Sequence, residues 1–468
     1  MNEPDRSHPQ PHEPPHSRPL FHSPWVICAV AFALRVAVIL VAHTYRIRTI
    51  GGNFDFGFEA GRIARSLVTG HGYANPFNGM SGPTAWLTPL YPLLLAAAFK
   101  LFGVYTHAAA IAVLVADSAF SALVVPAVYE IAQRCFDARG VARRQSTAAA
   151  PVALWSAWMW AAYPPALQYA VHWIWEMSLT VCLFSWALVV TLRLRGVGEN
   201  KQTGAERQGA QTAPGNAPLL WFVLGVLWGL IALCNSSLLL CLPASMVWVV
   251  WPQFRSGGLR RWRVWRNALA GAMLTTLAFT GVLAPWVARN ERVMHAFILT
   301  RSNFGVELYE STLFANDGFP WGASLPMWPG DPVFRQYERM GEVKYAQMRQ
   351  RQAIANIRSR PGQIARWTLD RFLFFWEGMP HAANGRPMQE YLREFSYSFL
   401  SACGLLGLAL MLRQKLEGAG LFALVFALVP LVYYFVTVQS RFRHPIEPLI
   451  AILGVYLFRS TEKSARKA

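Results

Sequence analysis

Apolar runs of about 15–25 residues recur along the chain, and a helix of that length can cross the hydrocarbon core of a membrane. Hydrophobic residues make up 54% of the 468 and charged residues only 15%, which is too apolar for a soluble protein of this length. The runs are continuous and lack the alternation of polar and apolar residues that membrane β-barrels show. The pattern therefore predicts an all-α polytopic membrane protein.

The formal net charge of +18 is carried mainly by short loops between the apolar runs. This placement follows the positive-inside rule of membrane proteins, so we expect no nucleic-acid partner. With the basic loops in the cytoplasm, we expect about ten crossings and two cytoplasmic ends. A shorter apolar run at 87–102, interrupted by Pro89 and Pro92, is expected to lie in the outer leaflet. The expected spans are 25–43, 107–133, 148–164, 173–194, 219–234, 237–251, 267–287, 396–412, 419–438 and 445–458.

The same reading divides the chain into four parts. Residues 1–24 are rich in proline and histidine and are expected to form a disordered cytoplasmic tail. A transmembrane core follows at 25–287, and it includes a long outer loop at 44–106. We expect an extracytoplasmic segment with short interfacial helices at 288–395, and C-terminal membrane helices with a basic tail at 396–468.

Three carboxylates on the outer side are candidates for catalysis. Asp55 and Glu59 follow the first span in the stretch NFDFGFEAGRIARSL, where neighbouring phenylalanines would desolvate them and raise their basicity, as a general base requires. An ordinary solvated loop is the alternative for this pair. Glu176 opens an apolar span, where an unpaired carboxylate is costly. Its presence indicates either a functional role or a structural arginine partner.

Two basic motifs depart from the positive-inside rule because they lie on the outer side. They are PWVARN, which contains Arg289, and QSRFRHP, which contains Arg441, Arg443 and His444. A planar guanidinium binds phosphate through two parallel hydrogen bonds, so these residues are candidates for binding an anionic headgroup. Anchoring of helix ends at the membrane surface is the alternative.

Three further residues are weaker candidates for contacts with substrate. Trp86 could stack on a sugar or anchor the chain at the interface, and Asn303 and Glu342 could contact an acceptor. The His, Cys, Asp and Glu residues show no metal-ligand spacing, so the sequence assigns no metal ligand and leaves dependence on a divalent metal open.

The order of these motifs resembles the membrane glycosyltransferases of the GT-C superfamily. The resemblance rests on FGFE, GRIARSL, GHGYANPF, GPTAW, PLYP, PWVARN, RSNFG and RFRHPIEP. It is strongest toward the family 39 branch, which includes protein O-mannosyltransferases and lipid A aminoarabinose transferases. The resemblance implies a GT-C fold, a polyprenyl-phosphate sugar donor and inverting transfer of a hexosyl or pentosyl group at an extracytoplasmic active site.

The resemblance also implies roles for individual residues. An acid of the first outer loop would act as the base, and family members often have adjacent Asp and Glu there. In this chain Asp55 and Glu59 are separated, so the choice stays open, with Glu59 favoured because it opens a helical stretch. Glu176 matches the second outer-loop acid. The four residues Arg289, Arg441, Arg443 and His444 would bind the lipid phosphate.

A transporter or lipid flippase is the competing hypothesis. Such proteins carry charged or broken helices in the middle of the bilayer and internal repeats. This sequence shows no repeat and is expected to keep its unusual charges at one face, so glycosyl transfer is favoured. The expected location is a bacterial inner membrane, with the active site on the outer face. The sugar and the acceptor, whether protein, lipid or glycan, are left open.

Overall fold

The described parts of the chain are helical. Within them no strand is present, and one isolated bridge joins Ala74 to Pro83. The all-α prediction is therefore confirmed. The disordered tail expected at 1–24 lies mostly outside the described residues. The structure is a computed structural model that describes residues 20–48, 55–136, 152–199, 217–255, 262–313, 324–379 and 387–465.

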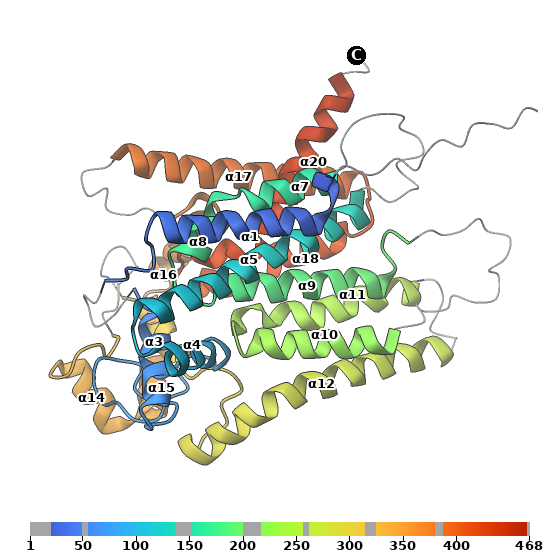
Figure 1. The fold of residues 1–468 in the computed structure, drawn as a ribbon. Helices are drawn as coiled ribbons and strands as arrows, with labels where there is room; N and C mark the ends of the chain where they lie inside the picture. Colours follow the sequence, from blue (N-terminus) through green and yellow to red (C-terminus); the bar gives the residue numbers. More distant parts are fainter. Residues whose placement is uncertain are drawn as a thin grey trace, which may run out of the picture.

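The helices form an elongated bundle with a cap of short helices at one end. Figure 1 shows α9, α10, α11 and α12 running side by side, with α3, α4, α14 and α15 gathered at the lower left. In chain order the helices are η1 (Leu20–His22), α1 (Pro24–Val41), α3 (Phe58–Val68), α4 (Leu90–Phe102), α5 (His107–Phe136), α7 (Val152–Ala161), α8 (Pro164–Val171), α9 (Met177–Arg195), α10 (Ala217–Ala232), η2 (Ser236–Leu240), α11 (Cys241–Arg255), α12 (Trp262–Met294), α13 (Phe304–Glu310), α14 (Pro332–Met340), α15 (Glu342–Ser359), α16 (Pro361–Glu377), α17 (Pro387–Arg413), α18 (Ala419–Leu428), α19 (Leu431–Phe435), η5 (Ser440–Ile446) and α20 (Glu447–Ala465).

Within the described residues, five helices are long and apolar enough to cross a membrane: α1, α5, α9, α12 and α17. They coincide with five of the expected spans, and they confirm a polytopic membrane protein. The other expected spans fall on α7, α10, α11 and α20, and on the pair α18–α19, whereas α8 begins only where the span 148–164 ends. Three helices run well past their expected ends, since α12 continues beyond 267–287, α17 begins before 396–412 and α20 continues beyond 445–458.

The short helix α4 occupies the apolar run at 87–102. Pro89 is its N-cap residue and Pro92 lies in its first turn. The expectation that these prolines interrupt the run is wrong, because proline in the first turn removes no helical hydrogen bond and its fixed φ suits a helix start. The prolines therefore begin α4 and set where it leaves the outer loop.

A pair of glycines brings α10 and α12 close together. Gly225 and Gly229 form a small-xxx-small pattern on α10, as at close helix crossings in membranes. A Cβ atom added at Gly225 would lie 2.4 Å from the carbonyl oxygen of Thr275, and one at Gly229 would lie 2.6 Å from Cβ of Val282. Thr275 also donates a hydrogen bond of 2.9 Å to the carbonyl of Trp221. The contact therefore requires glycine.

We expect Gly225→Ala to destabilise the protein because the added methyl group forces α12 away from α10. Overpacking of this kind costs about 1–3 kcal/mol, visible as a lower midpoint of thermal unfolding in detergent. Gly281→Ala is the matched control, since a Cβ atom there meets nothing within 4 Å. Equal midpoints for the two variants would contradict this account of the helix contact.

Arg35 and Asp117 are buried ionisable side chains on two of the membrane-spanning helices. Arg35 of α1 is fully buried and donates to the carbonyls of Ala31 and Ala161 and to Oγ of Ser121 at 3.0–3.1 Å. Asp117 of α5 is also fully buried and accepts a hydrogen bond of 2.8 Å from Tyr91. The expectation that unusual charges occupy one face only is therefore wrong for Arg35, whereas Asp117 lies close enough to Glu176 for their charges to interact. Their hydrogen bonds tie α1 to α5 and α4 to α5.

Candidate active site

The helix α3 sets the position of the outer-loop carboxylates. Its N-cap residue, Gly57, has a φ of 77°, a left-handed conformation that favours glycine. A Cβ atom there would also lie 3.1 Å from both the carbonyl oxygen of Ile174 and Cδ1 of Leu95. The tight turn places Glu59 in the first turn of α3, partly buried, and leaves Asp55 exposed before the helix. The two acids thus lie in different environments.

Glu59 has the properties of a general base near neutral pH. Burial raises the pKa of its carboxyl group to about 7, against smaller opposing effects of its backbone hydrogen bonding and of the charges of Arg62, Arg441 and Arg301. A carboxylate with this pKa accepts a proton far more readily than an exposed one, and it is still ionised at neutral pH in a large fraction of molecules. The fold thus gives the carboxyl groups of Glu59 and Asp55 different environments.

Arg441 is the cation at the centre of the site. Its guanidinium carbon lies 3.8 Å from the ring centroid of Trp175 and 5.2 Å from that of Phe442. Burial lowers the pKa of Arg441, and the nearby charges of Glu176, Glu59 and Glu307 oppose that shift. One guanidinium, placed over an aromatic ring, therefore interacts electrostatically with carboxylates from three separate segments of the chain.

Glu307 of α13 is one of these carboxylates. It accepts a hydrogen bond of 3.2 Å from Nδ2 of Asn303 and one of 3.0 Å from Oγ1 of Thr437. Asn303 is buried, so its amide orients Glu307 and its side chain does not face an open surface. Glu176 stands at the N-cap position of α9, directly after Trp175. Both acids are therefore fixed at the ends of helices around Arg441.

Arg301 links this cluster to the rest of the outer loop. Its Nε donates a hydrogen bond of 3.3 Å to the carbonyl of Trp86, and its charge acts on Glu59. The Trp86 ring itself is buried, with Phe77 edge-on at 4.9 Å and Tyr337 at 6.3 Å between ring centroids. The structure thus places the predicted sugar-stacking ring inside the cap, where it supports the loop.

Two predicted site residues hold the 73–85 segment in place. Arg289 donates hydrogen bonds of 2.6 Å to the carbonyls of Thr84 and Tyr73. Glu342 is buried and accepts from the backbone N–H of Ala85 at 2.7 Å, and also from the hydroxyls of Ser302, Tyr337 and Thr84. These contacts occupy both charged groups within the protein.

The three basic residues of the QSRFRHP motif point to different places. Arg443 and His444 are fully buried, and both pair with Glu447, at 3.5 Å and 2.7 Å. Arg443 also donates to the carbonyls of Trp376 and Tyr397 and to Oγ of Ser401. The turn of η5 therefore directs Arg443 and His444 into the bundle and leaves Arg441 beside the carboxylates.

The described residues offer no ready metal site. Among them, no group of three or more His, Cys, Asp or Glu side chains is close enough to hold a metal ion. The carboxylates around Arg441 are instead arranged about a cation that belongs to the chain itself.

Comparison with known proteins identifies the architecture. No protein-family model matches the chain, and no curated protein matches it in sequence. Among solved structures, the oligosaccharyltransferase of Archaeoglobus fulgidus in complex with Zn and sulfate matches with a TM-score of 0.51 at 13% identity, over 94% of this chain and 49% of that one. The archaeal oligosaccharyltransferase AglB from the same organism, in complex with an inhibitory peptide and a dolichol-phosphate, matches with a TM-score of 0.52 at 14% identity, over 94% and 52%.

The chain has a GT-C fold. It spans about half the length of the archaeal oligosaccharyltransferases that it matches. ArnT from Cupriavidus metallidurans bound to undecaprenyl phosphate is a further match. It is 16% identical over 94% of this chain and 79% of that one, with a TM-score of only 0.35. The GT-C fold predicted by resemblance is thus supported by structure, with the helical bundle and outer cap described above.

The site contains residues that sequence analysis did not select. Trp175, Arg301 and Glu307 join Glu59, Glu176 and Arg441. A local signal existed for Trp175, because an aromatic residue directly precedes an acid at the start of a span. No local signal separates Arg301 or Glu307 from the other charged residues of the outer segments. Only the fold brings α13, η5 and α3 together.

Proposed function

We propose that this protein transfers a sugar from a polyprenyl-phosphate donor to an acceptor hydroxyl at the extracytoplasmic face of the membrane. The observation that carries the proposal is the nearness of Glu59, whose pKa is raised to about 7, to Arg441, since the charges of the two side chains act on each other. The pair supplies a proton acceptor and a phosphate-binding cation at one end of a GT-C bundle. These are the two groups that such a transfer needs.

In the proposed reaction the acceptor oxygen attacks the anomeric carbon of the sugar. The new carbon–oxygen bond forms as the bond between that carbon and the phosphate oxygen breaks, and its electron pair leaves with the polyprenyl phosphate. Glu59 takes the proton of the acceptor hydroxyl. Arg441 and Arg301 stabilise the negative charge of the departing phosphate. A single displacement of this kind inverts the configuration of the sugar.

The structure favours Glu59 over Asp55 as the base in this proposal. Asp55 is exposed in front of α3, whereas Glu59 is partly buried in the first turn of that helix. Glu176 and Glu307 are assigned to orienting Arg441 and balancing its charge until the phosphate binds. Arg443 and His444 are assigned to holding η5, because their partners lie within the bundle.

The remaining parts of the proposal rest on resemblance. The outer-loop motifs support membership of the family 39 branch, transfer of a hexosyl or pentosyl group, and a bacterial inner membrane. The AglB structure contains a dolichol-phosphate, which supports a lipid-phosphate donor here. The structure of the Archaeoglobus fulgidus oligosaccharyltransferase with Zn and sulfate contains a metal ion. The described carboxylates of this chain do not group as metal ligands, so the proposed steps use no metal ion.

A donor panel tests the proposal. Membranes containing the protein receive radiolabelled polyprenyl-phosphate hexoses and pentoses, and parallel samples receive nucleotide-linked sugars. We expect label to move from one lipid donor to a second, chemically distinct product, and none to move directly from nucleotide sugars. Membranes containing Glu59→Gln are the matched control. If wild type carries label across the bilayer without forming a new product, the transporter hypothesis replaces this one.

A further inference from the structure

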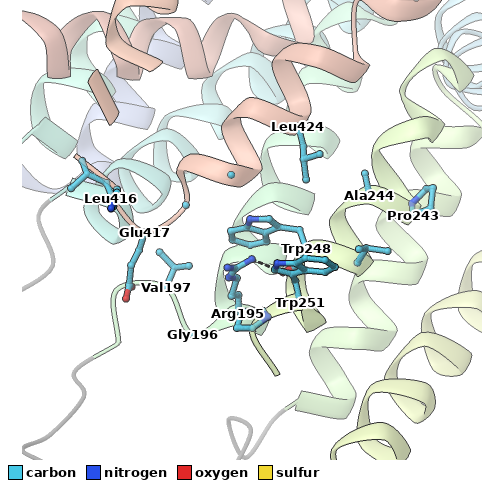
Figure 2. A pocket seen from close by; sticks show the side chains of 15 residues that line it. Arg195, Gly196, Val197, Pro243, Ala244, Trp248, Trp251, Leu416, Glu417 and Leu424 are labelled. Atoms are coloured by element: carbon cyan, nitrogen blue, oxygen red, sulfur yellow. Dashed lines mark hydrogen bonds between the residues drawn. The ribbon is translucent and has the colours of Figure 1, made fainter. Parts of the chain in front are cut away.

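A cavity of about 920 Å³ lies at the opposite end of α9 from Glu176. Figure 2 shows it between the last turn of α9, α11 and the turn that leads into α18. Glu176 stands at the N-cap position of α9, and Arg195 is the last residue of the helix. At 1.5 Å per residue, the helix spans about 28 Å, close to the thickness of a bilayer's hydrocarbon core. The cavity and the candidate active site therefore belong to opposite membrane faces.

One part of the cavity is apolar and faces the outside of the bundle. Ala244 and Val247 of α11 line it together with Leu424 of α18. Val247 is 55% exposed and Trp251 is 52% exposed, so the cavity opens where lipid surrounds the helices. Figure 2 shows Leu424 and Ala244 coming from these two different helices. The gap between α11 and α18 is suited to a hydrocarbon chain.

The other part of the cavity carries cations. The guanidinium carbon of Arg195 lies 3.8 Å from the ring centroid of Trp248, and Arg195 also donates to the carbonyl of Trp248. Lys415 is exposed at the turn between α17 and α18 and also lines the cavity. One acid, Glu417, lies at the same edge and accepts a hydrogen bond of 3.4 Å from the backbone of Gly198. The two cations outnumber the single acid.

We propose that this cavity binds an anionic phospholipid from the cytoplasmic leaflet. The phosphate would contact Arg195 and Lys415, and one acyl chain would lie between α11 and α18. Anionic lipids attract basic residues at the cytoplasmic surface by about 1 kcal/mol for each residue, and tryptophan rings such as Trp251 favour the level of the headgroups. The site is separate from the proposed sugar-transfer site, and its ligand is not the sugar donor.

Native mass spectrometry of the delipidated, full-length protein tests the proposal. The protein is titrated with the anionic lipid dioleoylphosphatidylglycerol and with neutral dioleoylphosphatidylcholine. We expect the first anionic lipid to bind wild type more tightly than the neutral lipid does. Lys415→Asn should weaken it about fivefold, the loss of one favourable cation. Asparagine suits this position because Lys415 has a φ of 54°.

Two further variants make the test specific. Ala244→Phe fills the apolar part without changing charge, so it should abolish tight binding of the anionic lipid. Arg413→Gln removes an exposed charge two residues from Lys415 that does not line the cavity, and it should bind like wild type. Equal affinity of wild type for both lipids, or wild-type affinity in Lys415→Asn and Ala244→Phe, would overturn the proposal. A loss of affinity for the anionic lipid in Arg413→Gln equal to that in Lys415→Asn would overturn it as well. None of these measurements requires a sugar donor.

Discussion

Replacing Glu59 with glutamine is expected to lower kcat for sugar transfer by about 10²–10⁴-fold, the usual contribution of a general base. Glutamine keeps the size of the side chain, but it cannot accept the proton of the acceptor. Glu59 is partly buried and glutamine fills the same space, so the substitution should leave the fold intact. The measurement is initial rate at saturating lipid donor, normalised to the amount of inserted protein.

Asp55→Asn is the matched control for this substitution. It makes the same chemical change four residues earlier, on an exposed side chain in front of α3. We expect its kcat to equal that of wild type. A large loss in Asp55→Asn with full activity in Glu59→Gln would reverse the assignment and make the exposed acid the base.

Replacing Arg441 with glutamine is the second change with a large expected effect. The substitution removes the cation beside Trp175 that faces Glu59, Glu176 and Glu307, so the departing phosphate loses a charge-assisted partner. Loss of one such preorganised group costs about 10²–10³-fold in kcat. Arg441→Lys should recover part of the loss, because lysine keeps the charge but lacks the planar fork that binds two phosphate oxygens.

Arg292→Gln is a suitable control for Arg441. Arg292 lies in the last turn of α12 on the same face of the protein, and it is exposed. We expect its transfer rate to match that of wild type. If Arg292→Gln and Arg441→Gln lose activity to the same extent, the effect is one of overall surface charge, and the assignment of phosphate binding to Arg441 is wrong.

Local sequence patterns were sufficient to predict the helical membrane fold. The length of each apolar run and the bias of basic loops depend on residues close in sequence, and α1, α5, α9, α12 and α17 follow from them. The start of α3 could also be predicted from the sequence, because the run after Glu59 has helical periodicity. Helix ends were less predictable. The polar ends of α12 and α17 continue as helix past their apolar stretches.

Side-chain placement depended on contacts that no local pattern encodes. Thr84 and Glu342 are 258 residues apart in sequence and share a hydrogen bond, so the cap packing of Glu342 could not be read from its neighbours. Arg441 and Arg443 are two residues apart, but the turn of η5 points them in different directions. Arg443 pairs with Glu447 inside the bundle, and Arg441 lies near the carboxylates of the site. The carboxylates Glu59, Glu176 and Glu307 meet one arginine only after the fold has brought their helices together.

The pH dependence of kcat/KM tests the central claim most directly. The claim is that Glu59 acts as the base, with a pKa raised to about 7 by burial. The reactive form is the carboxylate, so activity should rise about tenfold per pH unit below this value and level off above it. The small residual rate of Glu59→Gln should lack this rise. A wild-type rate that stays constant from about pH 5.5 to about pH 8.5, or a rise that survives unchanged in Glu59→Gln, would contradict the account.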